Sequence, residues 1–232
     1  LALAELARGR GLPVVGLLGY EAQVAGVGDR SPFDSTFARS AKRLMRTVSM
    51  RELVERRRQM VDRLKQAGFE LSFVNGGGTG SLDLADQSSG LTEVSAGSGL
   101  FKPRLFDFYS NPFVMGLAPA CFFALEVARR PAAGLVTCFG GGYVASGAYG
   151  RDKLPTPWLP RRLDLLPMEG AGEVQTPLRG DDADRLELGA PVVFRHAKAG
   201  ELLERFSELL VIDGERVAER LATYRGEGQA FG

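Results

Sequence analysis

A glycine-rich segment carries the clearest chemical signal in the sequence. It runs from Asn75 to Ser81 as Asn-Gly-Gly-Gly-Thr-Gly-Ser and follows an apolar stretch that is typical of a buried strand. Glycines allow backbone amides to approach an anion closely, and Thr79 and Ser81 add hydroxyl donors. The segment lacks the Gly-Lys-Ser/Thr of a nucleotide P-loop and the spacing of a dinucleotide fingerprint. It therefore indicates either a phosphate-binding loop or a flexible surface loop.

A second glycine- and serine-rich segment, Ala96-Gly97-Ser98-Gly99, follows the next candidate strand at its corresponding end. Loops that follow neighbouring parallel strands lie at the same edge of a sheet. The presence of two such loops favours the interpretation that they bind a phosphate monoester over the interpretation that the first is a flexible surface loop.

The histidine and the cysteines give weaker signals. His196 is the only histidine, and Cys121 and Cys138 each lie inside an apolar run and not at a metal-ligand spacing. A lone histidine more often orients a neighbour or titrates at a surface than binds a metal. The two cysteines favour buried thiols in a reducing compartment over a disulfide.

Two charged clusters have ordinary structural explanations. Glu169 and Glu173 flank the glycines of a sharp turn, so their spacing does not predict a general acid/base pair. The basic stretch 51–58 lies on a predicted helix whose opposite side is apolar, as expected of a solvated outer helix.

The segments that must position the glycine loops alternate between strand and helix. An apolar run over residues 12–19 predicts a strand buried on both faces. Apolar residues at three- and four-residue intervals predict a helix from about Phe37 to Ala67, which Gly68 ends. Residues 69–74 and 91–95 predict two further strands, and this order is typical of a parallel α/β sheet.

The chain after about residue 117 follows a different pattern. Short apolar runs alternate with turns rich in glycine, proline and aspartate, and only the stretch around 199–209 indicates a helix. We therefore divide the chain into an α/β domain, residues 1–116, and a mostly β domain, residues 117–232. The apolar runs of the second domain cover residues 121–128, 134–139, 163–168, 191–195 and 209–221.

Composition and charge argue against several classes of protein. The 232 residues are 44% hydrophobic, which is enough for a packed core in one or two domains. The 29 basic residues nearly balance the 28 acidic ones, so the net charge of +1 gives no footprint for nucleic acid or anionic lipid. No apolar stretch reaches the roughly 18 residues of a membrane span, and no signal peptide is recognisable. We therefore expect a cytoplasmic protein that binds neither nucleic acid nor a membrane.

A series of motifs in a fixed order runs through nearly the whole chain. The first half contains Gly19-Tyr20-Glu21-Ala22-Gln23, residues 74–81, residues 92–99 and Leu105-Phe106-Asp107-Phe108-Tyr109. The second half contains residues 139–147, 169–177, 195–201 and 223–228. These motifs resemble those of fold-type III pyridoxal-phosphate proteins, in the amino acid deaminase/aldolase branch that is related to D-threonine aldolase and D-serine dehydratase.

The resemblance implies a fold and a cofactor site. The fold would be the C-terminal part of an alanine-racemase-like α/β barrel followed by a β domain, with pyridoxal 5'-phosphate at the barrel mouth. By the same resemblance we expect a homodimer. The residues that would bind the cofactor are Gly78, Thr79, Gly80, Gly97 and Ser98, which would hold its phosphate, and Tyr20, which would line the pocket near its ring.

The resemblance places the Schiff-base lysine upstream of every motif found here, and no lysine of this chain matches its position. Lys102 and Lys198 are the lysines nearest the motif loops, and Pro103 and the loop context favour an ordinary exposed lysine at 102. The chain begins with Leu1, and the visible strand units are too few for an eight-stranded barrel, which takes about 250 residues. We therefore expect an N-terminally truncated fragment that is itself inactive.

A divalent metal beside the cofactor is a further possibility that the resemblance raises. In related D-serine dehydratases and D-threonine aldolases, a histidine followed two positions later by cysteine or aspartate binds the metal. Here His196 is followed by Lys198, a cation that would repel a metal. Glu201 or Glu204 could take the place of the second ligand. His196 is thus the candidate ligand, and the sequence does not decide whether a metal binds there.

The resemblance implies a lyase that acts on small β-hydroxy D-amino acids. The reaction would be aldol cleavage of the D-threonine type or dehydration and deamination of the D-serine type. The alternative is a non-catalytic protein that binds pyridoxal phosphate or another phosphate ester, as single-domain relatives of the barrel are thought to do. The β domain argues against this alternative, and it also argues against a sugar-phosphate enzyme built on a barrel alone.

Overall fold

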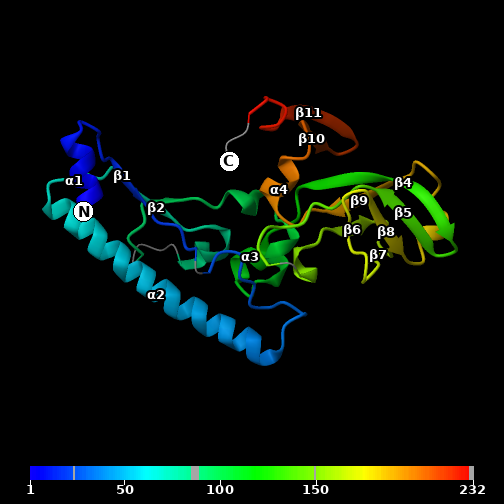
Figure 1. The fold of residues 1–232 in the computed structure, drawn as a ribbon, viewed down its shortest axis with the longest axis horizontal. Helices are drawn as coiled ribbons and strands as arrows, with labels where there is room; N and C mark the ends of the chain where they lie inside the picture. Colours follow the sequence, from blue (N-terminus) through cyan, green and yellow to red (C-terminus); the bar gives the residue numbers. More distant parts are fainter. Residues whose placement is uncertain (23, 85–88, 149, 230–232) are drawn as a thin grey trace. The chain divides into compact units, whose positions relative to one another are not determined.

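The computed structural model describes residues 1–22, 24–84, 89–148 and 150–229. Gln23, the last residue of the motif that begins at Gly19, lies outside the described residues. The chain forms two compact units (Figure 1). The first unit comprises Leu1–Leu100 and Phe106–Ala118, and the second comprises Phe101–Leu105 and Pro119–Gly232.

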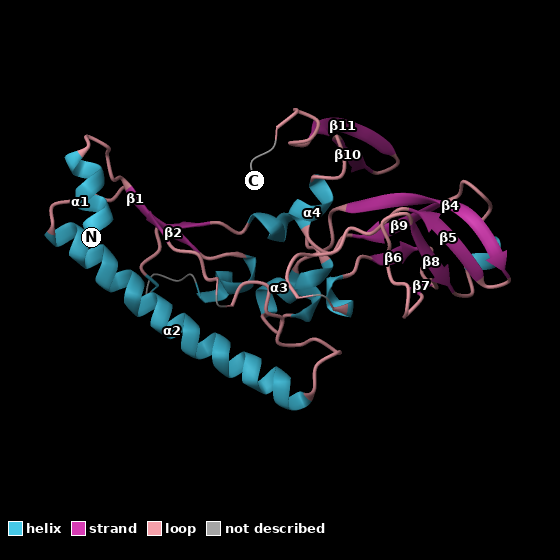
Figure 2. Cartoon of the chain, viewed as in Figure 1, coloured by secondary structure: helices cyan, strands magenta, loops and turns pink. Residues whose placement is uncertain are grey.

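The first unit combines a small parallel sheet with a long helix (Figure 2). The sheet has the strand order β1-β2-β3, and both pairs of neighbours are parallel. The strand–helix–strand order that the sequence predicts is therefore confirmed. The elements of this unit are α1 (Ala2–Gly9), β1 (Gly16–Leu18), α2 (Thr36–Gln66), β2 (Phe73–Gly76), β3 (Glu93–Val94) and α3 (Pro112–Gly116), with short 3-10 helices at Thr79–Leu84 and Gly97–Leu100.

Helix α2 begins and ends close to where the sequence predicts. The hydroxyl of Ser35 accepts a hydrogen bond from the backbone amide of Ala38 at 3.2 Å, which satisfies one amide of the first turn. Gly68, with a φ of +77°, follows the helix, and glycine adopts this left-handed conformation at little cost. Among the described residues, no helix is both long enough and apolar enough to cross a membrane.

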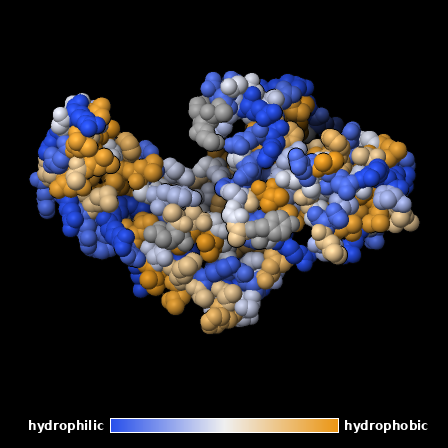
Figure 3. Space-filling model, in the orientation of Figure 1, coloured by the Kyte–Doolittle hydropathy of each residue, from blue (hydrophilic) through white to orange (hydrophobic). Residues whose placement is uncertain are grey.

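Strand β1 is shorter and more exposed than predicted. Only Gly16–Leu18 form the strand, and Leu18 is 69% exposed, so the prediction of a strand over 12–19 buried on both faces is wrong. Within the described residues β1 pairs with β2 alone. Exposed apolar side chains also cover α1, where Leu3 is 79% exposed, and Figure 3 shows this apolar surface at the N-terminal end. An apolar run is buried only where other elements cover it.

The second unit is dominated by an antiparallel sheet of six strands in the order β6-β9-β4-β5-β8-β7 (Figure 1). A separate antiparallel hairpin and a short helix, α4 (Ala199–Leu203), follow β9 in the chain. The mostly β character predicted for this part of the chain is confirmed. The strands are β4 (Phe122–Ala132), β5 (Leu135–Phe139), β6 (Thr156–Leu159), β7 (Asp164–Leu165), β8 (Gln175–Arg179), β9 (Pro191–Arg195), β10 (Glu208–Asp213) and β11 (Arg216–Ala222).

The apolar core of this unit lies on one face of its sheet. Along β4, Phe123, Leu125 and Val127 are buried, and the residues between them are exposed, as the two-residue period of a strand requires. The ring of Phe123 stacks on that of Phe194, with 5.2 Å between the ring centroids. Cys121 and Cys138 are buried here as free thiols, as predicted, and burial raises the pKa of Cys138 to about 11. The core cluster contains Cys121, Phe123, Leu125, Val127, Val136, Cys138, Leu163, Leu178, Ala183, Leu186, Val192, Phe194 and Leu202.

Two strands of the second unit, β6 and β8, are not predicted by the apolar runs of the sequence. Strand β8 has the sequence Gln-Thr-Pro-Leu-Arg, and only Thr176 and Leu178 of this strand are buried. Strand β6 contains Pro157, which normally argues against a strand. The run predicted over 209–221 is the hairpin of β10 and β11, with Gly214 at φ +61° between them. Glu169 and Glu173, before β8, are both exposed.

Lys102 is buried, contrary to the prediction of an exposed lysine. It is 4% exposed and has a φ of +46°, the one positive value outside glycine among the described residues. Its carbonyl accepts a hydrogen bond from the guanidinium of Arg195 at 3.2 Å, and the amide of Arg104 donates to the carbonyl of His196 at 2.9 Å. Lys102 is therefore buried because its segment is hydrogen-bonded to the end of β9.

Candidate functional site

The two glycine loops lie beside each other at the carboxyl ends of β2 and β3, as the sequence predicts. The two strands pair in parallel, with Gly76 opposite Val94. Beyond the strand ends, the hydroxyl of Thr79 donates a hydrogen bond to the carbonyl of Ala96 at 3.0 Å. A Cβ atom on Gly99 would lie 3.0 Å from the Thr79 side chain. The structure thus brings residues 78–80 and 97–99 together.

A buried asparagine ties the two strands together just before the loops. Asn75 is 4% exposed, and its side-chain amide donates to the hydroxyl of Ser95 at 2.9 Å and to the carboxylate of Glu93. The Ser95 hydroxyl in turn donates to the Asn75 carbonyl oxygen at 3.1 Å. Side-chain hydrogen bonds in a buried position restrict rotation, so the starting points of both loops are fixed.

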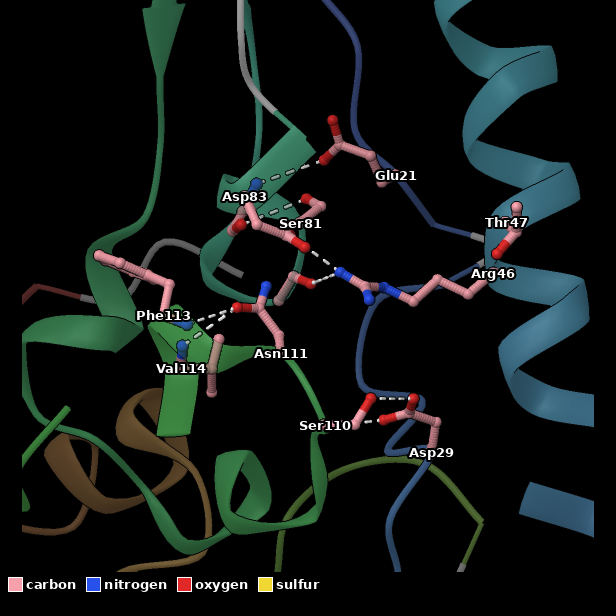
Figure 4. A network of polar contacts seen from close by, with 12 residues as sticks. Glu21, Asp29, Arg46, Thr47, Ser81, Asp83, Ser110, Asn111, Phe113 and Val114 are labelled. Atoms are coloured by element: carbon pink, nitrogen blue, oxygen red, sulfur yellow. Dashed lines mark hydrogen bonds and ion pairs between the residues drawn. The ribbon is translucent and has the colours of Figure 1, made fainter. Parts of the chain in front are cut away.

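One side of the first loop rests on Arg46 and Tyr109. The guanidinium of Arg46, on α2, donates to the carbonyl of Gly80 at 2.8 Å and to the carboxylate of Asp83 at 2.9 Å (Figure 4). A Cβ atom on Gly80 would lie 2.6 Å from the ring of Tyr109, so residue 80 must be glycine for the loop to pass this close. Burial raises the pKa of Tyr109 to about 12, and its phenol is therefore neutral at physiological pH.

The other side of the first loop contacts a buried ion pair. The carboxylate of Glu21 accepts hydrogen bonds from the backbone amides of Gly77 at 2.8 Å and Gly78 at 3.3 Å. Figure 4 shows the Glu21 side chain pointing towards this loop. The guanidinium of Arg57 donates to the same carboxylate at 3.1 Å and to the carbonyl of Ser89 at 3.2 Å. The Arg57 and Glu21 side chains are only 4% and 3% exposed. Two amides of the loop therefore already have a carboxylate as acceptor.

This ion pair is not predicted from the sequence. The prediction of a solvated basic face over residues 51–58 is wrong for Arg57, because its side chain is buried against Glu21. The position of Arg57 along the helix could have indicated that its side chain is buried. The buried residues of α2 are Met50, Arg57 and Leu64, which follow each other at intervals of seven and so lie along one stripe of the helix.

Tyr20 lines a pocket between the end of β1 and α2. The pocket has a volume of about 210 Å³, and Tyr20 itself is 65% exposed. Residues 78–80, 97 and 98 are not among the residues that line it. The structure therefore places Tyr20 at a concave surface, but not in one pocket with the glycine loops. The lining residues are Leu17, Leu18, Gly19, Tyr20, Ser49, Glu52, Leu53, Arg56, Arg57 and Met60.

His196 has the chemistry of a single metal ligand. Its ring Nδ1 lies 2.9 Å from the carbonyl oxygen of Cys121 and must carry a proton to donate to it. Burial lowers the pKa of His196 to about 4, so the ring is neutral and its buried Nε2 atom has no hydrogen-bond partner within the described residues. The ammonium of Lys198 bonds to the hydroxyl of Ser146. Across the described parts of the chain, no three His, Cys, Asp or Glu side chains are grouped to hold a metal ion, so a metal site at His196 stays a prediction.

Comparisons with known proteins support the fold. No protein-family model and no curated protein matches the sequence. The structure is similar to that of D-threonine aldolase from Filomicrobium marinum, with a TM-score of 0.72 and 19% identity, over 95% of this chain and 55% of that chain. It is also similar to D-threo-3-hydroxyaspartate dehydratase from Delftia sp. HT23, with a TM-score of 0.65 and 17% identity, over 96% of this chain and 59% of that chain.

The chain thus spans less than two thirds of the length of these two proteins. At identities below 20%, the likeness establishes the fold and leaves the activity to be argued from the site. An α/β part followed by a mostly β part was predicted from the sequence, and the structure has both. This chain therefore has the fold of D-threonine aldolase and D-threo-3-hydroxyaspartate dehydratase, as the resemblance of its motifs implied.

Proposed function

We propose that the two glycine loops bind the phosphate of pyridoxal 5'-phosphate and that the whole protein is a lyase dependent on this cofactor. The observation that carries the proposal is the contact between the loops, where the Thr79 hydroxyl bonds to Ala96 beyond two parallel strands. Phosphate groups bind at such strand ends in α/β barrels. The similarity in fold to two lyases supports the same assignment.

The loops have room and donors for an anion. A Cβ atom added to Gly78 or Gly97 would meet no other atom within 4 Å, so both loops are open on that side. Thr79 and Gly97 are the first residues of 3-10 helices, whose first amides have no acceptor within the helix. The guanidinium of Arg46 is bonded to the Gly80 carbonyl and paired with Asp83, and it supports the loop from behind. Gly80 and Ser98 complete the proposed phosphate site.

The reaction combines the chemistry of the cofactor with side chains that position it. Pyridoxal phosphate, when bound, supplies an electron sink for a carbanion formed on the substrate amino acid. The glycine loops of this chain would hold its phosphate. Tyr20 lines a separate pocket between β1 and α2, and only the resemblance of the motifs places it near the cofactor ring. None of the five lysines lies in either glycine loop. We expect the lysine that anchors the cofactor to be encoded upstream of Leu1, and we therefore expect no turnover from residues 1–232 alone.

Small β-hydroxy D-amino acids are the proposed substrates. The two solved structures with this fold are named for reactions of D-threonine and of D-threo-3-hydroxyaspartate. Both of these amino acids carry a hydroxyl group on Cβ. Aldol cleavage and dehydration are both compatible with such substrates, and the products that the complete protein forms from D-threonine or D-serine would decide between them. Aldol cleavage gives glycine and an aldehyde, and dehydration gives a 2-oxo acid and ammonia. Failure to consume either one would favour the alternative, a protein that binds the cofactor without turnover.

Binding of the cofactor can be tested directly on residues 1–232. We expect pyridoxal phosphate to bind in equilibrium dialysis, inorganic phosphate to compete with it, and pyridoxal, which lacks the phosphate, to bind about tenfold more weakly or worse. Gly78→Asp places a negative charge in the loop and should weaken binding by a similar factor, because like charges repel. Gly116→Asp is the matched control, since a Cβ at Gly116 also meets nothing within 4 Å. Equal binding by wild type and Gly78→Asp would contradict the proposal.

A further inference from the structure

The ion pair of Glu21 and Arg57 has no role in the proposed function as stated. It joins three segments, because Glu21 follows β1, Arg57 lies in the middle of α2, and the amides of Gly77 and Gly78 follow β2. Hydrogen bonds from backbone amides to a carboxylate are shorter and stronger than bonds to a neutral group. The pair is therefore placed to set the path of the first glycine loop.

We propose that Glu21 is a positioning residue for phosphate binding, an inference that rests on the proposed function. Its carboxylate holds the amides of Gly77 and Gly78, so the donors for the anionic ligand lie beyond Gly78. Gly78 itself contributes open space to the phosphate site and not its amide. Arg57 holds Glu21 in place and neutralises its charge. The neutral pair keeps an isolated carboxylate from repelling a phosphate that binds to the same loop.

The packing around Arg57 leaves little freedom for the pair to rearrange. A Cβ atom on Gly76 would lie 2.9 Å from the guanidinium and 2.9 Å from the carbonyl oxygen of Gly19. The Nε atom of Arg57 is buried and has no hydrogen-bond partner within the described residues. Replacing a buried ion pair by apolar residues often leaves stability unchanged or improves it, so stability alone does not account for this pair. Fixing the geometry of the loop is the role that its contacts support.

The competing interpretation is that Glu21 occupies the phosphate site and leaves it when the ligand arrives. Burial argues against this exchange, because the Glu21 side chain is 3% exposed and its departure would leave the charge of Arg57 buried without a partner. The two interpretations predict opposite effects of removing the carboxylate. If Glu21 positions the loop, removing its carboxylate should weaken phosphate binding. If Glu21 competes with the phosphate, removing its carboxylate should strengthen phosphate binding.

The test is a comparison of Glu21→Gln with wild type and with Glu55→Gln, which changes an exposed carboxylate that accepts a hydrogen bond from Gln59 on the same helix. We expect Glu21→Gln to weaken the binding of pyridoxal phosphate and of inorganic phosphate about tenfold or more, and Glu55→Gln to leave both unchanged. In Glu21→Ala, formate should restore part of the affinity, and chloride should not. Equal or tighter binding by Glu21→Gln would overturn the inference.

Hydrogen exchange separates this inference from the proposed function. In Glu21→Gln the amides of Gly77 and Gly78 should exchange faster with solvent, with amides of β4 and β9 unchanged. If wild type binds no pyridoxal phosphate, the proposed function fails, and the exchange rates still show whether Glu21 holds the loop. Unchanged exchange at both glycines would overturn the inference. Arg57→Lys, which keeps the charge, serves the same measurement if Glu21→Gln does not fold.

Discussion

The two units of the chain bury different kinds of side chain. In the second unit, a continuous apolar cluster that includes Phe123, Leu178 and Phe194 lies on one face of a six-stranded sheet. In the first unit, the apolar cluster of Phe106, Tyr109 and Val114 is small, and many of the buried contacts are polar. Glu21, Asp29, Arg57 and Asn75 are all buried there and all hydrogen-bonded.

The two kinds of burial have different effects: apolar burial mainly stabilises the fold, and buried hydrogen bonds mainly define the local geometry of the backbone. Apolar burial is non-directional and stabilises in proportion to the area removed from water. A buried hydrogen bond contributes less net stability, but it requires a defined distance and angle, so it fixes the backbone that it contacts. The second unit is therefore expected to depend on its apolar core, and the first to depend on polar contacts that hold the glycine loops.

The largest expected effect is the loss of an aromatic side chain from the core of the second unit. Phe194→Ala should lower the free energy of unfolding by about 3–5 kcal/mol, because Phe194 is 1% exposed and stacks on Phe123. Leu188→Ala, at a residue that is 66% exposed, should change it by no more than about 0.5 kcal/mol. Urea unfolding followed by the fluorescence of Trp158, which lies in β6 of the same unit, measures both. Similar losses in the two variants would contradict the importance of the core.

The next effect is a dependence of stability on pH at His196. Its pKa is lowered from 6.5 to about 4 in the folded protein because burial disfavours the charged ring. The unfolded chain therefore binds a proton that the folded chain does not. The stability contribution is complete above pH 6.5 and is lost as the pH falls towards 4, and the loss amounts to about 3 kcal/mol.

The control for this prediction is His196→Asn, which keeps a donor for the Cys121 carbonyl but does not titrate. Urea unfolding at about pH 7.5 and about pH 4.5 should show a larger loss in the wild type than in the variant. If both proteins lose stability equally between these two pH values, His196 is not the group responsible.

The smallest of the three effects lies in the polar first unit. Asp29 is 3% exposed, and its carboxylate accepts hydrogen bonds from the amide and the hydroxyl of Ser110 (Figure 4). Burial alone would raise the pKa of Asp29, but the bonds from Ser110 outweigh it and lower the pKa below 3.8. Asp29→Asn should cost about 2 kcal/mol, because both bonds lose their charged acceptor and one of them loses its acceptor oxygen.

Hydrogen exchange of the Ser110 amide would measure this loss, and Asp62→Asn, at an exposed residue of α2, is the control. The contribution of Asp29 should be present above pH 3.8 and disappear as the pH falls through the lowered pKa. An effect as large as that of Phe194→Ala would contradict the contrast between the two units.

Local sequence determined those parts of the fold that depend on spacing and end signals. The interval of apolar residues predicted α2, and Ser35 and Gly68 delimit it, because helix capping involves residues that are near each other in the chain. The glycine loops were also predicted, since they follow strands that are parallel neighbours. The apolar runs of β4, β5 and β9 were sufficient to predict strands for the same local reason.

Tertiary structure decided which of these residues are buried and which of them meet. Arg57 resembles its exposed neighbours in sequence, and Lys102 resembles a loop lysine, yet both are buried by segments far away in the chain. Leu18 shows the reverse, because it lies in an apolar run and is nevertheless 69% exposed, in a strand that pairs with β2 alone within the described residues. Burial and pairing depend on contacts between residues that are distant in sequence, and a local pattern contains no information about which distant residue will supply the contact.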